Sequence, residues 1–97
     1  MDIKTEYTFI FHTDPGHAWL AVKRDLVTAL GLSYKISSYS YQNKTMVYLE
    51  EDCDTPLLLD ELRARGIQYN IKERYQERSR IRGYQNFDPN PLQLLCY

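Results

Sequence analysis

The stretch EYTFIFHTDPGHAWLAV, residues 6–22, decides how this chain folds. From Glu6 to His12, Phe9 and Phe11 fall on one face of a strand and Ile10 on the other, so both faces carry apolar side chains, as in a central strand. Asp14–Gly16 then supplies turn residues, because proline presets its own φ and glycine accepts a positive φ. His17–Val22 follows as a second strand. The stretch therefore predicts a β-hairpin.

The sequence after this hairpin contains the signals of another hairpin, two helices and a last strand. In two places apolar residues recur at helical spacing and stop at a glycine, and the second helix has Pro56 in its first turn, after the potential cap Thr55. A short polar turn separates the segments of the second hairpin. The expected elements are a helix over Lys23–Leu30, strands over Lys35–Tyr41 and Thr45–Glu50, a helix from Thr55 to Gly66, and a half-buried strand over Ile67–Tyr75.

The order ββαββαβ predicts an α+β fold. We expect a mostly antiparallel five-stranded sheet with two helices on one face, which leaves the other face for docking. One domain is expected over residues 1–82. An irregular C-terminal tail is expected over residues 83–97, because the chain turns polar after Tyr75 and then carries Pro89 and Pro91.

Composition narrows the class of protein. The 97 residues carry a formal net charge of −1, which argues against both disorder and a surface coated with positive charge. No apolar run approaches the length of a membrane span, and the acidic N-terminus does not resemble a secretory signal. Two cysteines, Cys53 and Cys96, make no disulfide framework. We therefore expect a cytoplasmic protein with reduced thiols that does not enter membranes.

The turn holds the only two histidines of the chain, His12 and His17, with Asp14 between them. If the hairpin forms, the histidines are expected to be cross-strand neighbours, and the three side chains then suit zinc or another transition metal. A further ligand would come from the acidic segment, namely Asp52, Cys53 or Asp54. The simpler interpretation has no cofactor, with Asp14 bonded to its own backbone.

The same histidines raise the alternative of a small metal- or histidine-dependent enzyme. His12 or His17 could act as a general base, because imidazole titrates near neutral pH. Ser37, Ser38 and Ser40 offer hydroxyl groups as nucleophiles. However, the sequence has no nucleophile elbow, no phosphate-binding glycine loop and no Cys–His signature, so we favour a protein that is not an enzyme.

Charge is unevenly distributed along the chain. Residues 50–61 hold six acidic residues and no basic one. This fits cation binding, mimicry of phosphate groups toward a positively charged partner, or simply a loop and the acidic start of a helix. Residues 72–84 are basic, with tyrosines interleaved, which fits either single-stranded nucleic acid binding or an edge strand guarded by charge. The basic residues are Lys72, Arg74, Arg78, Arg80 and Arg82, with Tyr75 and Tyr84 among them.

Nine tyrosines are many for a chain of this length. Tyr39, Tyr41 and Tyr48 are expected to form a stripe across adjacent strands, and exposed tyrosines are favoured anchors in protein interfaces. The alternative is that these rings cover the core. The residues expected to bind a partner are therefore Tyr39, Tyr41, Tyr48, Arg74, Arg78, Arg80, Arg82 and Tyr84.

Three segments, FHTDPGHAWLAV, KISSYSYQ and VYLEEDCDTPLLLDEL, together resemble a group of small uncharacterised proteins carried by phages, plasmids and other bacterial mobile elements. The resemblance covers residues 7–82. It implies a protein that inhibits a host defence system, as anti-CRISPR proteins do. Together with the charge and tyrosine patterns, it leads us to expect a protein-binding module with a protein partner, and nucleic acid as the alternative.

Overall fold

The predicted hairpin is present in the computed structural model, which describes residues 2–90. Strand β1 (Glu6–Thr13) pairs antiparallel with β2 (Ala18–Lys23). The turn closes where the Asp14 N–H donates to the His17 carbonyl at 2.9 Å. As a result His12 lies opposite Trp19, and the expectation that His12 and His17 are cross-strand neighbours is wrong. The reason is that β1 continues through Thr13, so the turn lies one residue later and the partner of His12 is Trp19, two residues beyond His17.

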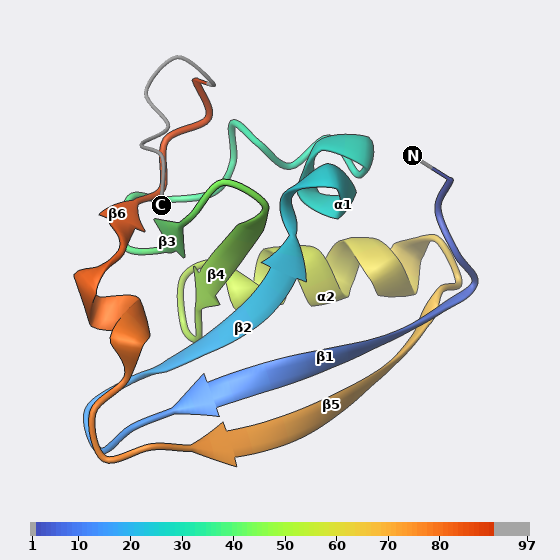
Figure 1. The fold of residues 1–97 in the computed structure, drawn as a ribbon. Helices are drawn as coiled ribbons and strands as arrows, with labels where there is room; N and C mark the ends of the chain where they lie inside the picture. The colour runs from blue at the N-terminus through green and yellow to red at the C-terminus, as the bar shows by residue number, and fades with distance from the viewer. Residues whose placement is uncertain (1, 91–97) are drawn as a thin grey trace.

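The sheet has six strands in the order β5-β1-β2-β4-β3-β6. The remaining strands are β3 (Tyr41–Gln42), β4 (Met46–Glu50), β5 (Gln68–Tyr75) and β6 (Gln85–Asn86). The α+β class is confirmed, but the sheet is mixed, because β5 runs parallel to β1 while every other pair is antiparallel. A helix carries the chain from β4 to β5, so β5 starts at the same end of the sheet as β1 (Figure 1).

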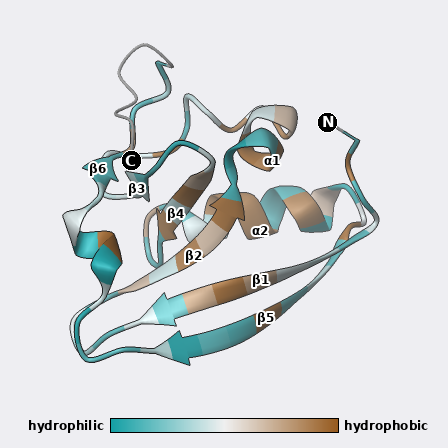
Figure 2. Cartoon of the chain, in the orientation of Figure 1, coloured by the Kyte–Doolittle hydropathy of each residue, from teal (hydrophilic) through white to brown (hydrophobic). Residues whose placement is uncertain are grey.

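Two helices, α1 (Arg24–Ala29) and α2 (Thr55–Ala64), contribute to a single hydrophobic core. Leu26 and Leu62 are at most 1% exposed, and each buried leucine stabilises the fold by about 1.5–3 kcal/mol. They pack with residues that the strand register places on one face of the sheet: Phe9, Leu20, Val22, Val47 and Leu49. Both helices therefore cover the same face, as expected, and brown segments appear in Figure 2 on β1, β2, β4 and both helices.

The start of α2 differs from the sequence expectation by one residue. Asp54 is the N-cap, and Thr55 lies within the helix, where its hydroxyl donates to the Leu49 carbonyl at 3.0 Å. Pro56 occupies the first turn, as predicted. The buried Asp54 carboxylate does not cap the helix, so its oxygens are available to another part of the chain.

That other part is the segment predicted as a strand over Lys35–Tyr41, which is a loop up to Ser40. Asp54 accepts hydrogen bonds from the Ser37 N–H at 3.0 Å, from the Ser37 hydroxyl at 2.7 Å and from the Ser40 hydroxyl at 2.5 Å. These bonds satisfy the buried carboxylate and hold the loop against α2. The strand prediction is wrong because a side chain distant in sequence fixes this segment.

The segment after β5 folds back over the sheet. A 3₁₀ helix, η1 (Arg80–Gly83), precedes β6, and Phe87 is buried in the main core. Residues 83–90, which fall in the predicted tail, thus contribute a strand and a core residue. Residues 91–97 of that tail, including Cys96, lie outside the described residues. No helix among the described residues is long and apolar enough to span a bilayer.

Candidate functional site

The two histidines of the turn have separate surroundings. The His12 ring packs edge-on against Tyr48, with 6.1 Å between ring centroids. Burial, and secondarily the nearby Arg74, lower the pKa of His12 below its usual value. His12 therefore takes part in packing on the face opposite the helices, and it is not in the group of potential metal ligands that the described residues form.

Asp14 is committed to other partners. Its side chain is only 1% exposed, and it forms a two-point ion pair with Arg82, at 2.7 Å from Nε to Oδ2 and 2.8 Å from Nη2 to Oδ1. Oδ1 also accepts the backbone N–H groups of Gly16 and His17, both at 3.0 Å. The Arg82 guanidinium is the main reason why the pKa of Asp14 lies well below its usual range. Both oxygens of the Asp14 carboxylate thus already have hydrogen-bond partners.

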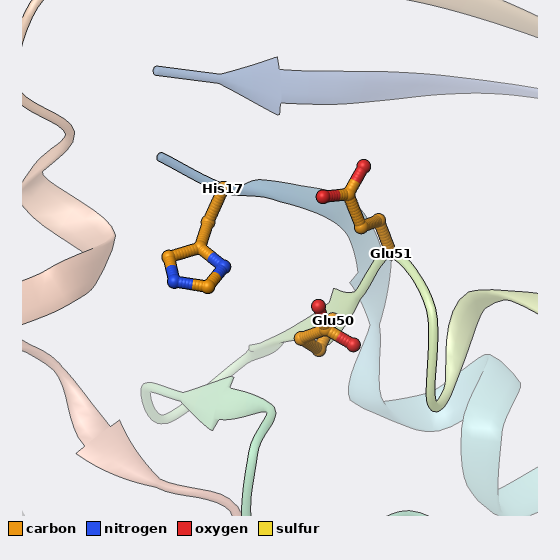
Figure 3. Close-up of side chains that lie close together, drawn as sticks. All are labelled: His17, Glu50 and Glu51. Carbon is orange, nitrogen blue, oxygen red and sulfur yellow. The ribbon is translucent and has the colours of Figure 1, made fainter. Parts of the chain in front are cut away.

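His17 lies instead beside two glutamates. One potential ligand atom from each of His17, Glu50 and Glu51 falls within 4.8 Å of the others. Figure 3 shows these three side chains as near neighbours, with His17 just before β2, Glu50 at the end of β4 and Glu51 directly after it. The pairing of β2 with β4 brings them together, because Trp19 lies opposite Glu50 and the Glu51 N–H donates to the Ala18 carbonyl at 3.1 Å.

From the sequence, Asp52, Cys53 or Asp54 was expected to complete the group of His12, Asp14 and His17. Glu50 and Glu51 were expected only as part of the acidic segment. The available signal was the strand register. When β2 and β4 pair antiparallel, the start of β2 meets the end of β4, so Glu51 lies opposite Ala18 and next to His17. That pairing could not be derived from either hairpin alone, since β2 and β4 belong to different hairpins.

His17 and Glu50 border a pocket of about 310 Å³ on the face opposite the helices. Glu50 is 9% exposed, and its Oε2 accepts the N–H groups of Asp52 at 2.9 Å and Cys53 at 2.8 Å. The Cys53 thiol hydrogen-bonds to Glu50, and this bond is the main cause that raises the pKa of Cys53. The pocket is lined by His17, Trp19, Tyr39, Tyr41, Glu50, Asp52, Cys53 and Arg82.

The charge of this pocket is negative. Burial, followed by the neighbouring carboxylates of Asp52 and Glu50, raises the pKa of Glu51, which shows that like charges are crowded here. Arg82 is the one cation among the lining residues, and Asp14 already neutralises it. The pocket is therefore suited to a positively charged group.

The three tyrosines of the predicted stripe have different surroundings. Tyr39 is 70% exposed on its rim, while Tyr41 is half-buried and packs edge-on against Trp19, with 6.1 Å between centroids. Tyr48 lies opposite Tyr41 in the sheet, but its ring packs on Tyr84 at 5.2 Å. The face expected to be open is thus covered at this end, where the Arg82 guanidinium also lies 5.3 Å from the Trp19 ring.

A second surface lies along β5, at the opposite edge of the sheet from β6. β5 was expected to be half-buried, but Tyr69 is its one residue that is not exposed; Ile71 is 43% and Tyr75 56% exposed. Most residues of this strand are polar, and it is accordingly mostly hydrophilic in Figure 2. Among the described residues, no ion pair involves the basic residues of this edge: Lys72, Arg74, Arg78 and Arg80.

The backbone of β5 presents unused hydrogen-bonding groups at this edge. The N–H groups of Gln68 and Gln76 donate to β1-side carbonyls, those of Thr5 and Thr13. Because backbone groups alternate in direction along a strand, even-numbered residues of β5 face β1 and odd-numbered residues face outward. The outward N–H and C=O groups belong to Tyr69, Ile71, Glu73 and Tyr75.

Comparisons with known proteins give no further guide to either surface. No protein-family model matches the chain, and no curated protein or solved structure matches it. The chemistry of the β5 edge and of the histidine–glutamate pocket is therefore the basis for assigning a function.

Proposed function

We propose that this chain is a non-enzymatic binding protein that docks an extended, acidic segment of a partner protein along β5. The observation that carries the proposal is the β5 edge itself, an eight-residue strand whose residues are exposed except for Tyr69. An exposed edge strand of this length is a template for pairing with another chain. A partner segment would extend the sheet by one strand, which is a common mode of peptide recognition.

The side chains of β5 favour an acidic partner. Lys72 and Arg74 project from one face of the strand, while Ile71 and Tyr75 are exposed on the other. Backbone hydrogen bonds would supply affinity, the two apolar side chains would bury area, and the cations would select carboxylates. Arg78 and Arg80, which follow β5, extend the positive charge beyond the end of the strand.

The resemblance to proteins of mobile elements gives this proposal a biological setting. In that setting the partner is a component of a bacterial defence complex in the cytoplasm of the host. Docking of this component on β5 would block the function of the complex. The positive edge would also speed the encounter with an acidic partner, and the rate would fall as salt is added.

A proline substitution tests strand addition directly. The Ile71 N–H faces away from β1, so Ile71→Pro removes a donor that the partner needs and leaves the pairing with β1 complete. We expect Ile71→Pro to weaken binding of a fluorescein-labelled peptide of alternating glutamate and valine by at least about tenfold. The measurement is fluorescence anisotropy at two salt concentrations, with circular dichroism to verify folding.

The matched control is Ile71→Val, which keeps the N–H and a similar apolar surface, and should bind like the unaltered chain. Arg74→Glu should weaken binding without unfolding the protein, because this residue has no ion pair among the described residues. A ten-residue thymidine oligonucleotide forms the second arm. Binding of the oligonucleotide but not the peptide would assign the edge to nucleic acid and overturn the proposal, as would binding of neither.

A further inference from the structure

We propose that His17, Glu50 and Glu51 form a binding site for a divalent transition-metal ion, with zinc as the preferred ion. The site differs from the one the sequence suggested, because it shares only His17 with the group His12, Asp14 and His17. It is also independent of the β5 edge, so either proposal can fail without the other.

The distances between these three side chains are close to those between the ligands of a bound metal ion. Their potential ligand atoms lie within 4.8 Å of one another, whereas two ligands of one zinc ion lie at most about 4.2 Å apart, twice the usual bond length. His17 is exposed and Glu51 is half-buried, so small side-chain rotations can close the difference.

One ligand is already held in place. Glu50 is only 9% exposed, yet it lines the pocket, and two backbone N–H groups fix its Oε2. Hydrogen bonds of this kind orient metal-binding carboxylates in known sites. The crowded carboxylates of Glu50, Glu51 and Asp52 would gain from a divalent cation, since Arg82, the cation nearest to them in the pocket, is paired with Asp14.

The donor set selects the class of ion. An imidazole nitrogen beside carboxylate oxygens suits zinc and its neighbours, whereas magnesium and calcium prefer oxygen ligands alone. The Cys53 thiol belongs to a residue that lines the same pocket, so it is the candidate for a softer fourth ligand. Three protein ligands in an open pocket also leave room for water or for a group from a partner.

The test is a calorimetric titration of zinc chloride into the full chain after dialysis against a chelator, with magnesium chloride as the second probe. We expect one zinc ion per chain and no comparable heat from magnesium. His17→Ala and Glu51→Gln should each weaken zinc binding by at least about tenfold, as loss of a supporting residue alone does in characterised sites. The matched control is His12→Ala, which removes the other histidine and should leave zinc affinity unchanged.

Trp19 gives a second readout that does not depend on heats. It is the only tryptophan of the chain, and its ring lies 5.9 Å from the His17 ring. Cobalt(II), as a zinc substitute, should quench its fluorescence in the unaltered chain and in His12→Ala, but not in His17→Ala. A sulfur-to-cobalt charge-transfer band that disappears in Cys53→Ser would assign the fourth ligand to the thiol.

Three results would overturn this site: no saturable zinc binding, equal binding of magnesium, or full zinc affinity in His17→Ala. The Ile71→Pro variant should bind zinc like the unaltered chain. Failure of peptide docking together with normal zinc binding would therefore reject the proposed function and leave the metal site standing, and the opposite pattern would reject only the metal site.

Discussion

The carboxylate of Asp14 connects the first turn of the chain to Arg82, which lies 68 positions later. Asp14→Asn keeps an oxygen for the turn but removes the charge that pairs with Arg82, so we expect a lower melting temperature. The matched control is Asp60→Asn, because the Asp60–Arg63 pair is solvent-exposed and such pairs contribute little. Thermal unfolding followed by circular dichroism compares the two, and equal effects would contradict the structural role of Asp14.

The same residue makes stability depend on pH. The folded-state pKa of Asp14 is lowered, chiefly by Arg82, so its contribution is fully present above the unfolded-state pKa of about 3.9. That contribution is lost as the pH falls from there toward the folded-state value. Urea unfolding between pH 6 and pH 3 should therefore show a steeper loss for the unaltered chain than for Asp14→Asn. Parallel curves would mean that Asp14 is not paired.

At the scale of the element, the end of α2 depends on one glycine. Gly66 has a φ of +71°, its N–H donates to the Arg63 carbonyl at 3.0 Å, and the chain then turns into β5. Gly66→Ala should destabilise the protein by about 1–2 kcal/mol, because side chains strain this backbone conformation. Gly83→Ala is the control, since Gly83 has no positive φ and open space at Cβ. Urea unfolding gives both values, and equal ones would contradict the explanation.

Elements with strong local signals could be predicted from the sequence, and those fixed by distant contacts could not. The hairpin of residues 6–22 and helix α2 carry their own turn and cap residues, and both were predicted to within a residue or two. The loop before β3 has a strand-like pattern, but Asp54 holds it through Ser37 and Ser40. Strand β6 has only two residues and pairs only with β3, so no periodicity reveals it.

In the candidate site, too, the residue with a local sequence signal could be predicted, and the residues brought in by distant pairing could not. His17 was identified from the sequence because histidine is rare in the chain and lies beside turn residues. Its partners Glu50 and Glu51 depend on the pairing of strands from different hairpins, which residue spacing does not encode. Asp14 looked like a ligand because its partner Arg82 is so distant in sequence.

For the whole molecule, the separation of charge governs association. The formal net charge is close to zero, but cations gather along β5 while carboxylates surround the pocket near His17. Replacing Lys72 and Arg74 together by valine should cause self-association through β5, because an uncharged edge strand is prone to pairing. Sedimentation velocity over a range of concentrations measures this. Lys35→Val with Lys44→Val removes the same charge elsewhere and should leave a monomer; association of both variants would point to net charge instead.

The parallel pairing of β1 with β5 also sets when the molecule can fold during synthesis. β1 leaves the ribosome among the first residues, yet its neighbour on one side is β5, which extends to Tyr75. Contacts between such distant segments form slowly, since a long loop must close before they stabilise the chain. During synthesis, one edge of β1 therefore stays unpaired until most of the polypeptide has been translated. In this interval we expect the nascent chain to be most prone to chaperone binding and to aggregation.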